Sequence, residues 1–323
     1  MKLAKAYGFL KKDLNTIETA LNETIQAKHP ILRNASTQLL EAGGKRIRPV
    51  FVLLSGRFGD YDLDRLKTVA VSLELIHMAT LVHDDVVDDS TLRRGKPTVK
   101  QLYGNRVAMY TGDYILARAL ESITDIQDPR IHQLLSKTLV DVAVGEIEQI
   151  KYKYNWDQQL RDYLRRIKRK TALLIATSCK LGAIAGHASD KNAQRLYQYG
   201  YYIGMSYQII DDILDFTASV KELGKPTASD LLQGNITLPV LFAMQDEPFN
   251  THLRETFAHP DSVSEHDLNE LITMLMNTDA IERSYEISDR YLDKALKVLD
   301  KLPNQREKGT LQAIAGSIGN RRS

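Results

Sequence analysis

Residues 73–88 read LELIHMATLVHDDVVD, an apolar helical stretch that ends in the acidic pentad Asp84-Asp85-Val86-Val87-Asp88. Residues 201–215 have the same plan, YYIGMSYQIIDDILD, and end in Asp211-Asp212-Ile213-Leu214-Asp215. Residues i and i+4 share a helix face, so the first and last aspartates of each pentad point the same way. Clustered carboxylates repel one another unless a cation lies between them. Two such clusters facing each other would hold several Mg²⁺ ions, because this ion binds carboxylate and substrate phosphate oxygens.

The composition is that of a globular protein without a general affinity for nucleic acid. The 323 residues are 43% hydrophobic and 26% charged, which excludes wholesale disorder. Lys and Arg total 43 against 41 acidic residues, so we expect no nucleic-acid partner. The lone cysteine, Cys179, lies in the apolar stretch TALLIATSCKLGAIAG, where we expect a buried, inert thiol in a reducing compartment.

We expect neither a secretory signal nor a membrane span in this chain. Its first residues, MKLAKAYGFLKKDLNTIETAL, alternate lysines with apolar residues and lack a continuous apolar core. No run approaches the eighteen or so apolar residues that a span requires. We expect a cytoplasmic protein with no transmembrane segment, and this composition is compatible with loose contact with a membrane surface.

Proline and apolar spacing predict a single all-α domain covering residues 1–323. No proline occurs between Pro129 and Pro226, and that interval is rich in helix formers with helix-spaced apolar positions. Convincing alternating strands are absent, and VFVLLSG (50–56) is too short to change this prediction. Further helices are expected at 65–88, 106–123, 268–279 and 281–299, with breaks at 43–49, 93–97, 127–130 and 223–235.

Four basic clusters accompany the acidic pentads. Diphosphate carries several negative charges, and neutralising it takes both metal ions and Arg or Lys donors. An acidic pentad followed by a cationic loop therefore fits a diphosphate site. The clusters are GGKRIRP (43–49), RRGKP (93–97), RRIKRKT (165–171) and GKP (224–226).

Each of these motifs taken alone has an ordinary structural interpretation. A single DDxxD is usually a solvated helix end, and RRIKRK a solvated helix face. GGKRIRP is also compatible with a helix-terminating turn. His77 and His83, on a mostly apolar helix, are more typical of core or edge histidines than of ligands. The joint occurrence of the motifs in one helical chain favours the functional interpretation.

Taken together, the motifs resemble those of the trans-isoprenyl diphosphate synthases. The similarity runs from about residue 40 to 240 in the family's order. Within the family, FVLLSGRFGDYD, GEIEQIKYKYN and YLRRIKRKTALLIA are most similar to the catalytic, larger components of bacterial two-component heptaprenyl diphosphate synthases. The matching segments are GGKRIRP, LELIHMATLVHDDVVDD, RRGKPT, TGDYIL, KRKT, GMSYQIIDDILDF, LGKP and GNITLPV.

The resemblance implies the isoprenoid synthase fold, with long helices around a deep central cavity, and a complete set of site residues. Asp84, Asp88 and Asp211 would hold about three Mg²⁺ on an allylic diphosphate, with Asp85, Asp212 and Asp215 as further ligands or supports. The allylic diphosphate would be bound by Arg93, Lys170, Thr171, Gln208 and Lys225, and Lys170 counts among the catalytic residues with the six aspartates. Isopentenyl diphosphate would be bound by Lys45, Arg48, His77 and Arg94.

Product length follows from the residues one turn before the first pentad. Ala79 and Thr80 lie roughly 6–7 Å deeper than Asp84 at the 1.5 Å rise of a helix. In the family, bulky residues at this depth stop growth early. These two small side chains predict a long-chain product of about C30 to C40. Within that range, the resemblance to the two-component heptaprenyl diphosphate synthases implies heptaprenyl diphosphate.

Two positions depart from the family pattern. Lys100 stands where many members have a histidine after RRGxPTx, and Asn235 replaces the lysine of GKxTLP. The second change removes one cation, which puts the strength of allylic diphosphate binding by the chain alone in doubt. It is compatible with an enzyme that needs a partner.

The resemblance favours a heterodimer with a smaller regulatory subunit that supplies the menaquinone side chain, with a homodimer as the alternative. Two other functions compete with this interpretation. A terpene cyclase would need no second diphosphate site, and its second metal motif usually has an Asn/Asp, Ser/Thr and Glu pattern. A non-catalytic regulatory subunit generally lacks one or both pentads. This chain retains both.

Overall fold

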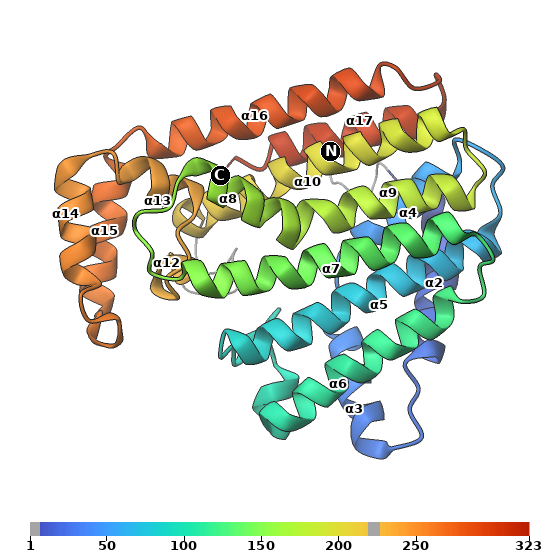
Figure 1. Cartoon of the computed structure of the whole chain (residues 1–323), viewed down its shortest axis with the longest axis horizontal. Helices are drawn as coiled ribbons and strands as arrows, with labels where there is room; N and C mark the ends of the chain where they lie inside the picture. Colours follow the sequence, from blue (N-terminus) through green and yellow to red (C-terminus); the bar gives the residue numbers. More distant parts are fainter. Residues whose placement is uncertain (1–6, 219–226, 323) are drawn as a thin grey trace. The chain divides into compact units, whose positions relative to one another are not determined.

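The computed structural model describes residues 7–218 and 227–322. Helices make up nearly all of the regular structure in these residues, which confirms the all-α prediction (Figure 1). The elements are η1 (Gly8–Leu10), α2 (Lys11–Thr24), α3 (Pro30–Glu41), α4 (Ile47–Gly56), α5 (Leu63–Val87), β1 (Leu92–Arg93), β2 (Lys96–Pro97), α6 (Val99–Ile123), α7 (Pro129–Tyr152), α8 (Leu160–Ile167), η2 (Lys168–Ala172), α9 (Leu173–Ala185), α10 (Asp190–Thr217), α12 (Ser229–Leu232), α13 (Leu238–Ala243), α14 (Glu247–Thr256), η3 (Pro260–Ser262), α15 (Glu265–Met276), α16 (Ala280–Leu299) and α17 (Arg306–Gly319).

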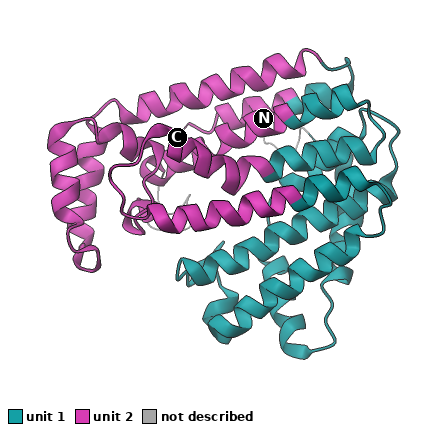
Figure 2. Ribbon diagram, in the orientation of Figure 1, with its two compact units in different colours: residues 1–136, 174–197, 302–311 teal, residues 137–173, 198–301, 312–323 magenta. Residues whose placement is uncertain are grey.

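The chain divides into two compact units, each assembled from separate stretches of sequence (Figure 2). Unit 1 comprises residues 1–136, 174–197 and 302–311, and unit 2 comprises 137–173, 198–301 and 312–323. The division falls within α7, α9, α10 and α17, so each of these helices contributes residues to both units. The first pentad belongs to unit 1 and the second to unit 2.

Helix α5 is the central helix of unit 1. It begins at an Asp62 cap, whose carboxylate accepts the N–H groups of Asp64 and Arg65. Its buried residues lie on nearly every side, which is typical of a helix enclosed by others. Among the described helices, α5 alone is long and apolar enough to cross a membrane. Of its most apolar 18-residue stretch, 67% is buried within the protein.

Glycines bring helices of unit 1 into close contact. A Cβ atom on Gly112 of α6 would lie 2.3 Å from Nε2 of His83 on α5. A Cβ atom on Gly182 of α9 would lie 2.3 Å from the carbonyl oxygen of Val52 on α4. The α4–α9 crossing therefore requires a residue without a side chain, because backbone faces Gly182, whereas at Gly112 the His83 side chain would have to shift. Cys179 of α9 is fully buried, as predicted, and burial raises the pKa of its thiol to about 12.

A two-residue hairpin is the one β-structure among the described residues. Strands β1 and β2 pair antiparallel around Arg94 and Gly95, whose φ values are +53° and +75°. Two consecutive positive φ values are the signature of a tight hairpin turn. The prediction of a break at 93–97 was correct, but two-residue strands carry no periodic signal that would reveal the pairing.

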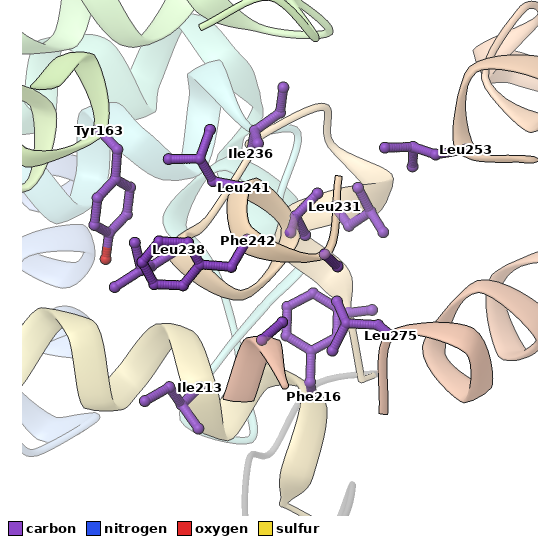
Figure 3. Packing of buried hydrophobic residues seen from close by; sticks show 14 of the residues in the cluster. Tyr163, Ile213, Phe216, Leu231, Ile236, Leu238, Leu241, Phe242, Leu253 and Leu275 are labelled. Carbon is purple, nitrogen blue, oxygen red and sulfur yellow. The ribbon is translucent and has the colours of Figure 1, made fainter. Parts of the chain in front are cut away.

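Unit 2 is built around the end of α10 and a large apolar cluster. Figure 3 shows side chains of this cluster, including Ile213, Phe216, Leu238 and Phe242. These residues come from α10 and α13, and further members come from α8, α12, α14 and α15. The cluster fixes the helix that carries the second pentad.

Candidate functional site

The first pentad occupies the last turn of α5. Asp84 and Asp88 are half-buried, and the backbone N–H of Asp88 donates to the Asp84 carbonyl oxygen at 2.8 Å. The two carboxylates therefore come from positions one turn apart on one face of the helix, as predicted. Asp85 has a different environment, because it is 2% exposed and turned into the protein.

Arg93 holds Asp85 in place. Its Nε donates to Oδ1 and Oδ2 of Asp85 at 2.9 and 3.0 Å, and its Nη2 donates to Oδ1 at 2.6 Å. The β1–β2 hairpin brings Arg93 back to the end of α5. A guanidinium fork on a buried carboxylate is a strong, geometrically specific pair, so Asp85 is a support of the pentad in this structure.

A group of arginines surrounds His77 in unit 1. Burial lowers the pKa of His77 well below its ordinary value, and the positive charges of Arg48, Arg94, Arg93 and Arg46 lower it further. The structure therefore brings together three of the four residues predicted to bind isopentenyl diphosphate: Arg48, His77 and Arg94. The fourth, Lys45, is exposed in the loop that leads into α4, whose first turn carries Arg48.

The loop of GGKRIRP is shaped by Gly44 and Arg46. A Cβ atom on Gly44 would lie 2.8 Å from Nη1 of Arg94 and 3.1 Å from Nη1 of Arg46, so the backbone passes close to both guanidinium groups. Arg46 itself pairs with Glu18 at 2.8 Å and with the buried Glu74 at 3.3 Å. Sequence reasoning missed these pairs. The only available signal was a glutamate within the apolar stretch 73–83.

The other singled-out residues of unit 1 also have defined places. Ala79 is 2% exposed, and the Thr80 hydroxyl donates to the His77 carbonyl oxygen at 2.8 Å. Nε2 of His83 lies 3.3 Å from the Asp113 carboxylate across the α5–α6 contact, as expected of an edge histidine. Lys100 forms an ion pair with Asp89. This pair gives one of the two departures from the family pattern a structural role beside the first pentad.

The second pentad ends α10, and two of its carboxylates are buried. Asp212 is 4% exposed, and its oxygens accept hydrogen bonds from the Tyr163 hydroxyl at 2.7 Å and from Nε2 of Gln208 at 2.8 Å. Burial, with a smaller contribution from the charge of Asp230, raises the pKa of Asp212 to about 7. Asp212 is therefore a support of the second pentad, as Asp85 is of the first.

Asp215 and Asp211 differ in burial and in their hydrogen-bond partners. Asp215 is fully buried and accepts hydrogen bonds from the Ser229 hydroxyl and the Asp230 backbone N–H, both at 3.2 Å, which fixes the start of α12. Asp211 is half-buried and pairs with Arg321 at 2.8 Å. Nothing in the sequence pattern pointed to Arg321, because a single arginine far along the chain has no recognisable spacing from the pentad.

The π-helical turn η2 presents Lys170 and Thr171. Nζ of Lys170 donates to Oε1 of Gln149 at 2.8 Å, and the Thr171 hydroxyl donates to Oε1 of Gln208 at 2.5 Å. A Cβ atom on Gly204 of α10 would lie 2.5 Å from Cα of Ala172, so the two backbones are in close contact. Gln208 lies one turn after Gly204, next to this close contact. It links Thr171 to Asp212, because it accepts a hydrogen bond from Thr171 and donates one to Asp212.

The described residues include neither the predicted Lys225 nor a preformed cluster of metal ligands. Lys225 lies outside the described residues. Within the described ranges, no three His, Cys, Asp or Glu side chains are placed so that they could hold a metal ion together. Of the six pentad aspartates, Asp85, Asp212 and Asp215 are buried, whereas Asp84, Asp88 and Asp211 are partly exposed to solvent.

Comparisons with known proteins identify the family. The polyprenyl synthetase model matches residues 29–275. Heptaprenyl diphosphate synthase component 2 of Bacillus subtilis (strain 168) is 56% identical over 322 residues, covering 100% of this chain and 92% of the relative. The component 2 of Geobacillus stearothermophilus is also 56% identical, over 321 residues and 99% of both chains.

Solved structures give the same result. The crystal structure of heptaprenyl diphosphate synthase from Staphylococcus aureus matches with a TM-score of 0.92 and 42% identity, over 97% of this chain and 99% of that one. A polyprenyl synthase from Caulobacter crescentus CB15, complexed with calcium and isoprenyl diphosphate, matches with a TM-score of 0.94 and 27% identity, over 100% and 98%. The chain has the all-α isoprenoid synthase fold, belongs to the polyprenyl synthetase family and is a trans-prenyltransferase.

Proposed function

We propose that this chain is the catalytic subunit of a long-chain trans-polyprenyl diphosphate synthase. It adds isopentenyl diphosphate head to tail onto an allylic diphosphate, with farnesyl diphosphate as primer and heptaprenyl diphosphate as product. The observation that carries the proposal is that both pentads are present at helix ends, each with buried carboxylates held by protein donors and half-buried carboxylates beside them. The two relatives named heptaprenyl diphosphate synthase component 2 are each 56% identical to this chain over at least 99% of its length.

The solvent-accessible carboxylates fit Mg²⁺. This ion usually takes one or two carboxylates, retains several waters and completes its shell with substrate phosphates. A preformed cage of three carboxylates is therefore not required, in agreement with the described residues. Asp84, Asp88 and Asp211 would hold about three Mg²⁺ on the diphosphate, and these ions would supply electrostatic stabilisation of the leaving group.

The cationic and polar residues of the proposed allylic site would exchange their present partners for the diphosphate. Lys170 would leave Gln149, and Thr171 and Gln208 would turn from each other to phosphate oxygens. Arg93 is the exception, because it would keep its pair with the buried Asp85 and, like Lys225, only add a cation to this site. Neutralising the diphosphate lets the allylic C–O bond ionise. The new carbon–carbon bond then forms with isopentenyl diphosphate, and the released proton goes to the departing diphosphate.

The arginine group around His77 would bind isopentenyl diphosphate. Arg48 and Arg94 match the negative charge of a diphosphate, and Lys45 adds a flexible cation from the loop before α4. His77 stays neutral in this surrounding, so it offers one ring N–H as a hydrogen-bond donor without a further charge. Ala79 and Thr80 would line the cavity that accepts the growing chain and sets its length.

The relatives are named as one component of a synthase, which supports a heterodimer with a smaller regulatory subunit. We further propose that the two compact units act as one prenyltransferase domain, that the enzyme works in the cytoplasm with loose membrane contact for product release, and that its product becomes the menaquinone side chain. The buried, unpaired Cys179 is compatible with a reducing compartment.

One assay tests the catalytic assignment. The chain is incubated with farnesyl diphosphate, isopentenyl diphosphate and Mg²⁺, with and without the co-expressed smaller subunit, and product length is measured. We expect heptaprenyl diphosphate from the pair and its loss in D84A. Full turnover by D84A in the assembled complex would point to a regulatory chain, and turnover of farnesyl diphosphate alone would point to a cyclase.

A further inference from the structure

The segment after α17 is firmly placed in unit 2. The backbone N–H of Asn320 donates to the Gly316 carbonyl oxygen at 3.0 Å, and that of Arg321 donates to the Ile318 carbonyl oxygen at 3.1 Å. A Cβ atom on Gly319 would lie 2.9 Å from Cδ1 of Leu292, so the helix end packs directly on α16. The turn that carries the next two arginines is therefore held by contacts within unit 2.

These two arginines bind different helices. Arg322 donates to the Asp289 carboxylate of α16 at 2.6 Å, and its guanidinium lies 4.8 Å from the Tyr285 ring centroid. Arg321 donates to Oδ1 of Asp211 on α10 at 2.8 Å, and its guanidinium lies 5.2 Å from the Tyr207 ring centroid. Arg321 thus pairs with a carboxylate of the second pentad, whereas the adjacent Arg322 pairs with a carboxylate outside it.

We infer that Arg321 is a displaceable counter-ion of Asp211 that sets the metal affinity of the second pentad. It pairs with Asp211 while the pentad holds no metal, and it releases the carboxylate when Mg²⁺ and diphosphate bind. The inference rests on the proposed role of Asp211 as a Mg²⁺ ligand.

The degree of exposure makes this exchange feasible. The side chains of Arg321 and Asp211 are 31% and 37% exposed, and an ion pair that water reaches contributes little to stability. In unit 1, by contrast, the Asp85 side chain is 3% exposed and receives three hydrogen bonds from Arg93. Breaking that pair would leave a buried charge, which is far more costly. Of these two pairs, Arg321–Asp211 is therefore the one in which a metal ion can replace the guanidinium at low cost.

The need for a counter-ion follows from the neighbours of Asp211. Asp215 lies one turn after Asp211 on the same face of α10, and like charges so placed destabilise a helix. A guanidinium relieves this repulsion and still leaves when a divalent cation competes for the oxygen. Tyr207 precedes Asp211 by one turn, so the released guanidinium can remain over the aromatic ring.

The test compares R321Q with R322Q, which lose the same charge one residue apart. Each variant of the full chain is titrated with Mg²⁺ in the presence of farnesyl diphosphate, without isopentenyl diphosphate, and the rise of the melting temperature is followed. Because no competing cation remains at Asp211, R321Q should reach its half-maximal rise at about 3- to 10-fold lower Mg²⁺ than the wild type. R322Q should match the wild type, and R321K should lie between the wild type and R321Q.

An unchanged or higher Mg²⁺ midpoint in R321Q, while D211N loses the metal-dependent rise, would overturn the counter-ion inference and leave the proposed function standing. If D211N instead keeps the full rise, Asp211 is not a metal ligand. That result would overturn both the inference and the proposed metal site.

Discussion

At the scale of single residues, burial gives the aspartates of one pentad different roles. The pKa of Asp212 is raised to about 7, chiefly by burial, although Tyr163 and Gln208 donate hydrogen bonds to its carboxylate. The folded chain thus holds a proton on Asp212 that the unfolded chain releases above about pH 4. Stability is therefore lost as the pH rises from about 4 to 7, and the loss is complete above the folded pKa.

This difference predicts that D212N stabilises the metal-free protein at high pH. At pH 8 in EDTA the variant should gain up to about 2–4 kcal/mol, because it removes a buried charge. At pH 5 the gain should largely vanish, since wild-type Asp212 is then protonated. Melting temperatures at both pH values measure the effect, and D211N is the control. An equal gain at both pH values would contradict the assigned ionisation.

Ala79 carries the prediction on product length. A79Y places an aromatic ring one turn before Asp84 and should shift the product to shorter chains, whereas A79S, which adds only one oxygen, should not. Ala79 is almost fully buried, so the tyrosine is also expected to cost about 1–3 kcal/mol through overpacking. Product analysis by mass spectrometry, with melting curves to exclude unfolding, checks the result. Unchanged chain length in a folded A79Y would show that the limit lies elsewhere.

At the scale of helices, close crossings decide which glycines can change. G182A would push a Cβ atom to within 2.3 Å of the Val52 carbonyl oxygen, and backbone atoms cannot move aside cheaply. We expect a loss of about 1–3 kcal/mol. G316A is the matched control, because nothing lies within 4 Å of its Cβ position in α17. That change should stabilise the helix by about 0.5–1 kcal/mol. Opposite shifts of the two melting temperatures are the expected outcome.

Across the whole molecule, sequence reasoning succeeded where the signal is local. The helix predicted at 65–88 is α5 (Leu63–Val87), and that at 281–299 is α16 (Ala280–Leu299). Apolar spacing within one helix reports its buried face directly. The pentads could be placed at helix ends for the same reason. The tight hairpin at 93–97 was missed because its strands are too short to alternate.

What could not be predicted is how residues distant in the chain pair with one another. Arg321 reaches Asp211 across 110 positions, and Tyr163 reaches Asp212 across 49. Neither contact has a spacing rule, since each depends on which helices pack together. The burial of some pentad aspartates and the exposure of others could not be predicted either. Which side of a helix end is buried depends on the helices that pack against it.

The discontinuity of the two units also affects how the protein is made. Unit 1 contains residues 302–311, and Nε2 of Gln305 donates to the Arg57 carbonyl oxygen at 3.0 Å. The first pentad's unit therefore stays incomplete on the ribosome until residue 311 has been synthesised, long after its own helices have emerged. Contacts of such long range form slowly, and apolar surfaces remain uncovered meanwhile. The nascent chain should accordingly depend on chaperones until its last helix arrives.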